Sequence, residues 1–155
     1  MSDWYETMLG SLIKVKHGYA FGGDQITAEE QEKILVTPGN FCIGGGFKSA
    51  KYKYFRGDHP DAYVLNEGDI VVTMTDLSKE GDTLGYGAKI PVLKGKIFLH
   101  NQRIGLVEFK KTDVSRDFLY WVLRTPEYQG YVLGAATGTS VRHTSPTTCS
   151  QNQRT

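Results

Sequence analysis

Hydrophobic and polar residues alternate along several short segments of the chain, as they do in half-buried β-strands. Ile13 and Val15 alternate with lysines, and residues 70–72 form an apolar β-branched run after the turn sequence NEGD. Residues 96–110 have the pattern of two paired strands separated by a polar turn. These patterns predict a domain with substantial β-structure.

Helical patterns are concentrated towards the end of the chain. Ser115 is a good N-cap for a helix whose apolar face would be Phe118, Leu119, Val122 and Leu123. Thr125 then caps a second helix with Pro126 at its first position, ending at Gly134 or Gly138.

Two other segments are less regular. Residues 27–36 fit either a short helix capped by Thr27 or a polar loop leading into a strand at 34–36. Residues 3–12 form a short amphipathic element, and residues 77–95 are a long glycine-rich excursion.

Composition places the chain among ordinary globular proteins. Its 155 residues, 39% hydrophobic and 23% charged, are enough for one domain with a core. A net charge of +1 excludes a basic tail or an acidic mimic of DNA. The cysteines, Cys42 and Cys149, lack metal-type spacing, and no signal peptide or apolar run of about 20 residues is present. We therefore expect a reduced, soluble, cytoplasmic protein with no membrane partner.

Motifs for catalysis or cofactor binding are weak. The glycines at 44–46 lack the Gly-Lys-Ser/Thr of a P-loop, the four histidines are scattered, and no GxSxG elbow is present. Asp61 and Glu108 with Lys110 follow the order of a Mg²⁺-dependent nuclease, although Glu108 also fits the solvent face of a strand. We expect no catalytic residue, no metal and no cofactor, with the nuclease kept as an alternative.

Three polar segments fit contacts with nucleic acid. Residues 47–56 interleave Lys48, Lys51, Lys53 and Arg56 with aromatics, although an edge strand kept soluble by lysines looks the same. If that segment is a strand, Lys51 and Lys53 share one face and Tyr52 and Tyr54 the other.

The second and third polar segments are shorter. Residues 100–103 hold Asn, Gln and Arg, the types that read adenine and guanine edges, and they also suit a polar turn. Residues 137–143 offer hydroxyls, a glycine and a cation, which suit phosphate oxygens but also any helix exit.

Taken in order, these segments resemble a known family. Trp4 precedes MLGSLIKVKHGYAF at 8–21, followed by LNEGDIVVTMTD at 65–76, HNQRIGLVEF at 100–109 and DFLYWVLRTPEYQGYVLGAATGTSVRHTS at 117–145. This order is similar to a target recognition domain of the specificity subunit of type I restriction–modification systems. The resemblance covers nearly the whole chain to about Ser145.

The resemblance implies a function and a set of partners. A full specificity subunit carries two such domains separated by long helices, and each domain reads one half of a split site in double-stranded DNA. The helices recruit methyltransferase (M) subunits, which supply the chemistry, and the complex also holds restriction (R) subunits. A recognition domain is not itself catalytic.

The end of the chain departs from the family pattern. The family continues into a strand and a long spacer helix, whereas residues 146–155 have no apolar periodicity. We expect a DNA recognition domain over residues 1–145 and a disordered polar tail over 146–155. Contact with M and R subunits is therefore in doubt, and a half-subunit that pairs with a second one, or acts in assembly or regulation, is the alternative function.

The expected fold is mixed α/β (α+β), with a small curved, largely antiparallel sheet, flanking helices and a C-terminal helix pair. The expected function is sequence-specific binding of one DNA half-site. The candidate DNA-binding residues comprise phosphate contacts, base readers and groups at the helix exit: Lys48, Lys51, Lys53, Arg56, Thr75, Lys79, Gln102, Arg103, Thr139, Ser140 and Arg142.

Overall fold

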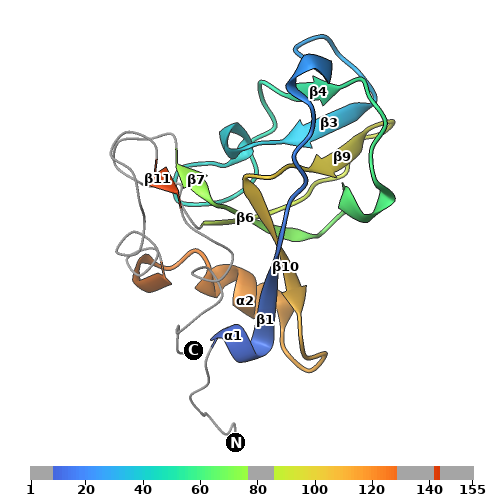
Figure 1. Ribbon diagram of the computed structural model, residues 1–155. Helices are drawn as coiled ribbons and strands as arrows, with labels where there is room; N and C mark the ends of the chain where they lie inside the picture. Colours follow the sequence, from blue (N-terminus) through green and yellow to red (C-terminus); the bar gives the residue numbers. More distant parts are fainter. Residues whose placement is uncertain (1–8, 77–85, 129–141, 144–155) are drawn as a thin grey trace, which may run out of the picture.

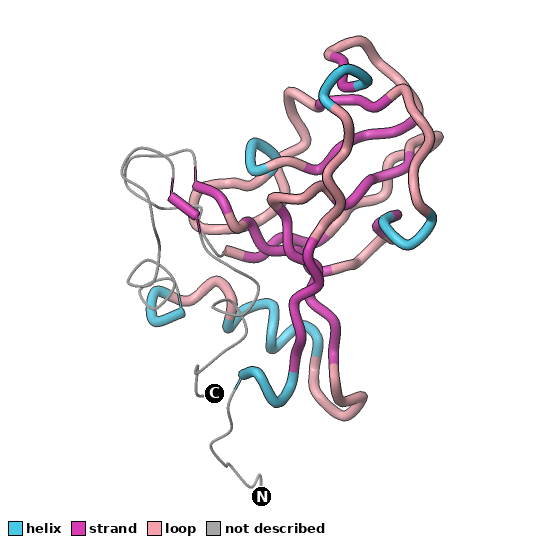
Figure 2. The backbone as a smooth tube through the Cα atoms, in the orientation of Figure 1, coloured by secondary structure: helices cyan, strands magenta, loops and turns pink. Residues whose placement is uncertain are grey.

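The predicted fold class, mixed α/β, is confirmed, but the strands are divided between two main sheets instead of one. The computed structural model describes residues 9–76, 86–128 and 142–143. Figure 1 shows the two sheets one above the other, with α1 and α2 beside the lower sheet. Figure 2 shows that long stretches of loop connect the strands and helices.

The four-stranded sheet is antiparallel throughout, in the order β1-β10-β6-β8. Its strands are β1 (Ile13–His17), β10 (Ile104–Phe109), β6 (Ile70–Thr73) and β8 (Gly87–Lys89). β6 is buried along its whole length, because both faces of the sheet are covered at this strand.

The five-stranded sheet is mixed, in the order β2-β4-β3-β9-β5. β3 and β9 are parallel, and the other neighbours are antiparallel. Its strands are β2 (Ile26–Thr27), β4 (Lys53–Phe55), β3 (Lys33–Val36), β9 (Ile97–His100) and β5 (Val64–Leu65).

Short elements complete the described chain. A two-stranded ladder joins β7 (Thr75–Asp76) to β11 (Arg142–His143). The helical elements are α1 (Leu9–Leu12), α2 (Arg116–Val122) and three 3₁₀ turns, η1 (Gly23–Gln25), η2 (Pro38–Asn40) and η3 (Asp61–Tyr63). A further helical segment begins at residue 126 and is described as far as residue 128. No described helix is long and apolar enough to cross a membrane.

Alternating side chains sort the core into three layers. Ile70 and Val72 point towards α1 and α2, where they pack with Leu119 and Leu123. Val71 points the other way, into a layer between the two sheets. On the far side of the five-stranded sheet, Leu35 packs with Phe21, Phe55 and Leu99. This last face carries the candidate site described below.

Several predicted elements are confirmed. The strands at 13–16 and 70–72 and the turn at 66–69 are present, the turn being closed by the Asn66 amide donating to the Asp69 carboxylate at 2.8 Å. Ser115 accepts from the Phe118 amide at 3.2 Å and Thr125 from the Tyr128 amide at 3.3 Å, so both N-caps form. For residues 27–36, the structure has the loop leading into a strand, not the helix.

Two predictions of local structure are wrong, the second only in part. β9 and β10 are strands but do not pair with each other, since the turn between them carries the chain from one sheet to the other. The apolar face predicted for α2 is right for Leu119 and for the C-cap Leu123, which are buried, and wrong for Phe118, which is half-exposed. Tyr120 is buried in addition. The C-terminal helix pair is described only as far as Tyr128.

Candidate nucleic-acid interface

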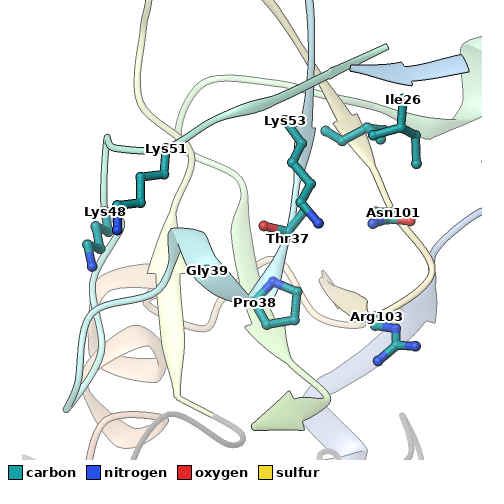
Figure 3. Close-up of a pocket in the computed structure, with 10 residues that line it drawn as sticks. Ile26, Thr37, Pro38, Gly39, Lys48, Lys51, Lys53, Asn101 and Arg103 are labelled. Carbon is teal, nitrogen blue, oxygen red and sulfur yellow. The ribbon is translucent and has the colours of Figure 1, made fainter. Parts of the chain in front are cut away.

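A pocket of about 480 Å³ opens at the end of the five-stranded sheet where β3 and β9 finish. Figure 3 shows Lys48 and Lys51 on one side of it and Asn101 and Arg103 on the other. Its lining comes from four parts of the chain and consists of Ile26, Leu35, Thr37, Pro38, Gly39, Lys48, Lys51, Lys53, Asn101 and Arg103. Segments distant in sequence thus converge on one site.

The charge of this pocket is of one sign. Lys48, Lys51, Lys53 and Arg103 are exposed, and the described residues that line the pocket include no aspartate or glutamate. Leu35 and Ile26 contribute apolar side chains to the lining. A cationic rim without a compensating acid suits an anionic ligand, and phosphate oxygens are the commonest partners of such side chains in nucleic-acid complexes.

Strand alternation explains how the basic and aromatic residues of 51–54 are sorted. Lys53 lies opposite Leu35 in the antiparallel pair of β4 and β3, on the pocket side. Tyr52 and Tyr54 pack instead against the layer between the sheets. Lys51 precedes the strand with φ +52°, yet it also lines the pocket. The predicted division of lysines and tyrosines is confirmed, although the strand begins only at Lys53.

The turn between β9 and β10, residues 100–104, presents Asn101 and Arg103 to the pocket. Its backbone is fixed on several sides: the Tyr19 amide donates to the His100 carbonyl at 3.0 Å, and the Met74 amide donates to the Arg103 carbonyl at 3.0 Å. Gly18 packs so closely that a Cβ there would stand 1.8 Å from the Asn101 carbonyl oxygen. Arg103 is therefore held by a rigid backbone while its side chain stays exposed.

His100 is the buried anchor of this turn. Its Nε2 lies 2.6 Å from the Ile104 carbonyl oxygen, and because a carbonyl only accepts, Nε2 must carry the proton. Its Nδ1 is buried with no hydrogen-bond partner among the described residues. Burial lowers the pKa of His100 to about 4, the Ile104 carbonyl opposes the shift, and the neighbouring Lys16 and His17 add to it. The ring is thus neutral at physiological pH.

Two further predicted site residues, Arg56 and Gln102, are described with their side chains and do not line this pocket. Arg56 forms an ion pair with Glu29 beside Thr27, and Gln102 is exposed on the turn. Thr75 pairs with His143, and Arg142 with Asp76, in the ladder of β7 and β11. Lys79, Thr139 and Ser140 lie outside the described residues, as does the predicted tail at 146–155.

Sequence reasoning singled out the segment 100–103 but left Asn101 off the candidate list, and it missed the segment Thr37-Pro38-Gly39. Asn101 could have been found from strand alternation. It stands two residues after Leu99 of β9, whose side chain lies on the same face of the sheet as Leu35 and the pocket. The segment at 37–39 carries no such signal, since its position depends on the parallel pairing of β3 with β9.

Among the residues that the structure describes, the carboxylates of the nuclease alternative do not form a metal site with their neighbours. Asp61 is exposed in η3, and Glu108 is exposed on β10 opposite Lys14. Within residues 9–76, 86–128 and 142–143, no group of three or more His, Cys, Asp or Glu side chains could hold a metal ion.

Comparisons with known proteins concern the fold. No protein-family model matches the sequence, and neither does any curated protein. The S subunit of a type I restriction–modification system from M. genitalium matches with a TM-score of 0.59 and 19% identity, over 97% of this chain and 33% of that chain.

Two further structures agree with this match. A chain from work on complex assembly and conformational transition of the type I R-M system matches with a TM-score of 0.63 and 11% identity, over 98% of this chain and 33% of its own. The HsdS subunit from Thermoanaerobacter tengcongensis matches with a TM-score of 0.51 and 10% identity, over 78% of this chain and 27% of its own. The chain spans about a third of these proteins or less, and it has the target-recognition-domain fold of type I restriction–modification S subunits.

Proposed function

We propose that this chain binds double-stranded DNA through the cationic pocket and its rim, and that it reads one half-site of a split recognition sequence for a type I restriction–modification complex. The observation that carries the proposal is the convergence of Lys48, Lys51, Lys53 and Arg103 around one opening. The fold shared with S subunits supports it independently.

The lysines and the turn would have different roles. Lys48, Lys51 and Lys53 are flexible point charges that suit backbone phosphates, so they would contribute affinity without sequence preference. Arg103 and Asn101 stand on a rigid turn, and their types pair in bidentate fashion with guanine and adenine edges. Gln102 projects from the same turn and is a further candidate reader. We propose no catalytic step within the chain.

Domain boundaries and localisation are part of the same proposal. The recognition domain would extend over residues 1–145, with 146–155 as a polar tail, and its place of action would be the cytoplasm. Thr75 and Arg142, in the ladder of β7 and β11, together with Lys79, Thr139 and Ser140, stay candidate DNA contacts.

Fluorescence anisotropy with short duplexes tests DNA binding. Nonspecific dissociation constants of roughly 10⁻⁴ to 10⁻⁶ M with a steep salt dependence are expected. The variant Lys53→Gln/Arg103→Gln should weaken binding and reduce the slope of log K against log salt by up to about 2.

A matched control removes equal charge elsewhere. Lys94 and Lys111 are exposed, and neither lines the pocket; Lys94 precedes β9, whereas the pocket lies beyond its end. Lys94→Gln/Lys111→Gln should leave affinity and slope nearly unchanged. Equal losses in both variants, or no binding by the unaltered protein at low salt, would overturn the proposal.

A second candidate function is assembly with methyltransferase subunits or another half-subunit. It is favoured by the outer face of α2, where Phe118 and Trp121 are 50% and 60% exposed. Phe118→Glu should abolish co-purification with a methyltransferase subunit while leaving DNA affinity unchanged. Co-purification that survives this substitution would show that α2 is not the contact.

A further inference from the structure

The loop at residues 42–51, here called the glycine loop, carries two of the pocket lysines, Lys48 and Lys51. Gly44, Gly45 and Gly46 have φ values of +81°, +103° and +97°, and Lys51 has +52°. Most side chains avoid these backbone angles, so the shape of the loop depends on glycine and on whatever holds it from outside.

The base of the glycine loop is held by Asn40. This buried side chain donates to the Lys48 carbonyl at 3.3 Å and to the Ala50 carbonyl at 3.4 Å. Near the tip, the Gly46 amide donates to the Gly87 carbonyl of β8 at 2.9 Å. Within the tip, the Gly45 amide donates to the Cys42 carbonyl and the Cys42 amide donates to the Gly46 carbonyl, both at 2.9 Å. Base and tip are thus each closed locally, and the Gly46 bond joins the tip to a distant part of the chain.

Arg124, which follows α2, makes the other distant contact with the tip. Its Nε donates to the Gly44 carbonyl at 3.3 Å and its Nη2 to the Gly45 carbonyl at 3.4 Å. The guanidinium packs directly on Gly45, since a Cβ there would stand 2.6 Å from Nε. Each hydrogen bond is long, but the planar guanidinium, with its fork of N–H donors, binds two successive carbonyls at once.

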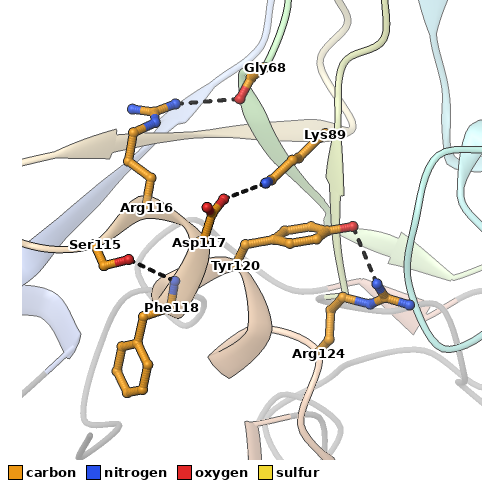
Figure 4. A network of polar contacts seen from close by, with 8 residues as sticks. All are labelled: Gly68, Lys89, Ser115, Arg116, Asp117, Phe118, Tyr120 and Arg124. Carbon is orange, nitrogen blue, oxygen red and sulfur yellow. Dashed lines mark hydrogen bonds and ion pairs between the residues drawn. The ribbon is translucent and has the colours of Figure 1, made fainter.

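Arg124 is itself oriented by aromatic neighbours and a firmly held helix. Its guanidinium carbon lies 4.8 Å from the Trp121 ring centroid, and its Nη1 donates to the Tyr120 hydroxyl at 3.5 Å (Figure 4). Leu119 and Leu123 pack in the same core cluster as Ile70 and Val72 of β6, so α2 is tied to the four-stranded sheet. The exposed pair of Lys89 with Asp117 at 2.6 Å adds little to this packing. The contact therefore joins the tip of the glycine loop to a stiff support.

We propose that Arg124 is a positioning residue for DNA binding: it holds the tip of the glycine loop so that Lys48 and Lys51 stand at the pocket, and it does so without touching DNA. Arg124 does not line the pocket, and its fork is occupied by the loop carbonyls. The role in DNA binding rests on the function proposed above, but the hold on the loop does not.

Hydrogen exchange of the DNA-free protein tests the hold on the loop. In Arg124→Gln the Gly46 amide should exchange about tenfold faster, because one link of the tip is lost, while amides of β6 stay protected. Arg124→Lys, which keeps the charge but not the fork, should give an intermediate rate. Unchanged exchange at Gly46 in both variants would overturn the proposal.

DNA affinity of the same variants tests the positioning role. Arg124→Gln should weaken binding about fivefold in the unaltered background and have no further effect in Lys48→Gln/Lys51→Gln, because it acts through those lysines. An equal loss in both backgrounds would show that Arg124 contacts DNA itself, and would contradict the positioning role. If Gly46 exchange changes as expected but no variant and not even the unaltered protein binds DNA, the hold on the loop stands and the proposed function fails.

Discussion

The two sides of the pocket are built in different ways. The turn at 100–104 is held by its own backbone bonds, by buried His100 and by the close approach of Gly18. The glycine loop depends instead on positive φ angles and on Arg124 from another part of the chain. A rigid side suits base reading, which needs fixed geometry. An adaptable side suits phosphate contacts, provided that a support such as Arg124 keeps its lysines within reach of the DNA backbone.

The largest expected effect tests the rigidity of the turn. Gly18→Ala would place a Cβ 1.8 Å from the Asn101 carbonyl oxygen, which is backbone and cannot move aside alone. We expect a loss of about 3 kcal/mol or more of unfolding free energy, measured by urea denaturation. Gly23→Ala is the control, since nothing lies within 4 Å of a Cβ there. Similar small losses in both would mean that the turn yields easily.

A pH titration of stability tests His100 as the anchor. Its pKa falls from 6.5 to about 4 on folding, so the unfolded chain binds the proton first as pH drops. The contribution to stability is complete above pH 6.5 and is lost between pH 6.5 and 4, by about 3 kcal/mol in all.

Comparison with His100→Gln isolates this contribution, because Glu30 and Asp117, whose pKa values are lowered by Lys96 and Lys89, titrate in acid as well. The glutamine amide can still donate to Ile104 but does not titrate. The variant should show a shallower loss of stability between pH 6.5 and 4, and parallel curves for the two proteins would argue against a buried neutral ring.

An intermediate effect tests the adaptable side. Gly44→Ala and Gly45→Ala both force alanine to positive φ, at a cost of about 1–2 kcal/mol each. Gly45→Ala should cost more, because it also displaces the Arg124 guanidinium, whereas nothing lies within 4 Å of a Cβ at Gly44. In an Arg124→Gln background, the difference in stability loss between Gly45→Ala and Gly44→Ala should shrink. If the difference persists, the contact with Arg124 is not its cause.

The smallest effect concerns Arg56. Its ion pair with Glu29 is exposed, with side-chain accessibilities of 52% and 77%, so Glu29→Gln should change stability by about 0.5 kcal/mol or less. Arg56→Gln should weaken DNA binding less than Lys53→Gln, which removes a charge from the pocket rim. A larger loss for Arg56→Gln would extend the interface to the β2–β4 edge.

The comparison also shows which features the sequence could predict. Local signals were enough for the strand at 70–72 and for the caps Ser115 and Thr125, since each depends on neighbours along the chain. The basic character of residues 48–53 and the polar turn at 101–103 could be predicted from the local sequence as well. The same holds for the division of residues 51–54 into a lysine face and a tyrosine face.

Features that depend on distant pairing could not be predicted. A polar turn between two apolar strands looks like a hairpin, but β9 pairs with β3 and β5 whereas β10 pairs with β1 and β6, so the turn crosses between sheets. β8 has the sequence Gly-Ala-Lys, which carries little strand signal and becomes a strand through pairing with β6. The convergence of the loop, Thr37 and Arg103 on one pocket follows from such pairings.

Backbone amide shifts measured by NMR during titration with a short DNA duplex test the central claim most directly. The structure leads us to expect that the largest shifts fall at Thr37 and Gly39, at 48–53 and at 101–103, on both sides of the pocket. Shifts confined to the outer face of α2, around Phe118 and Trp121, with the pocket signals unmoved, would contradict it.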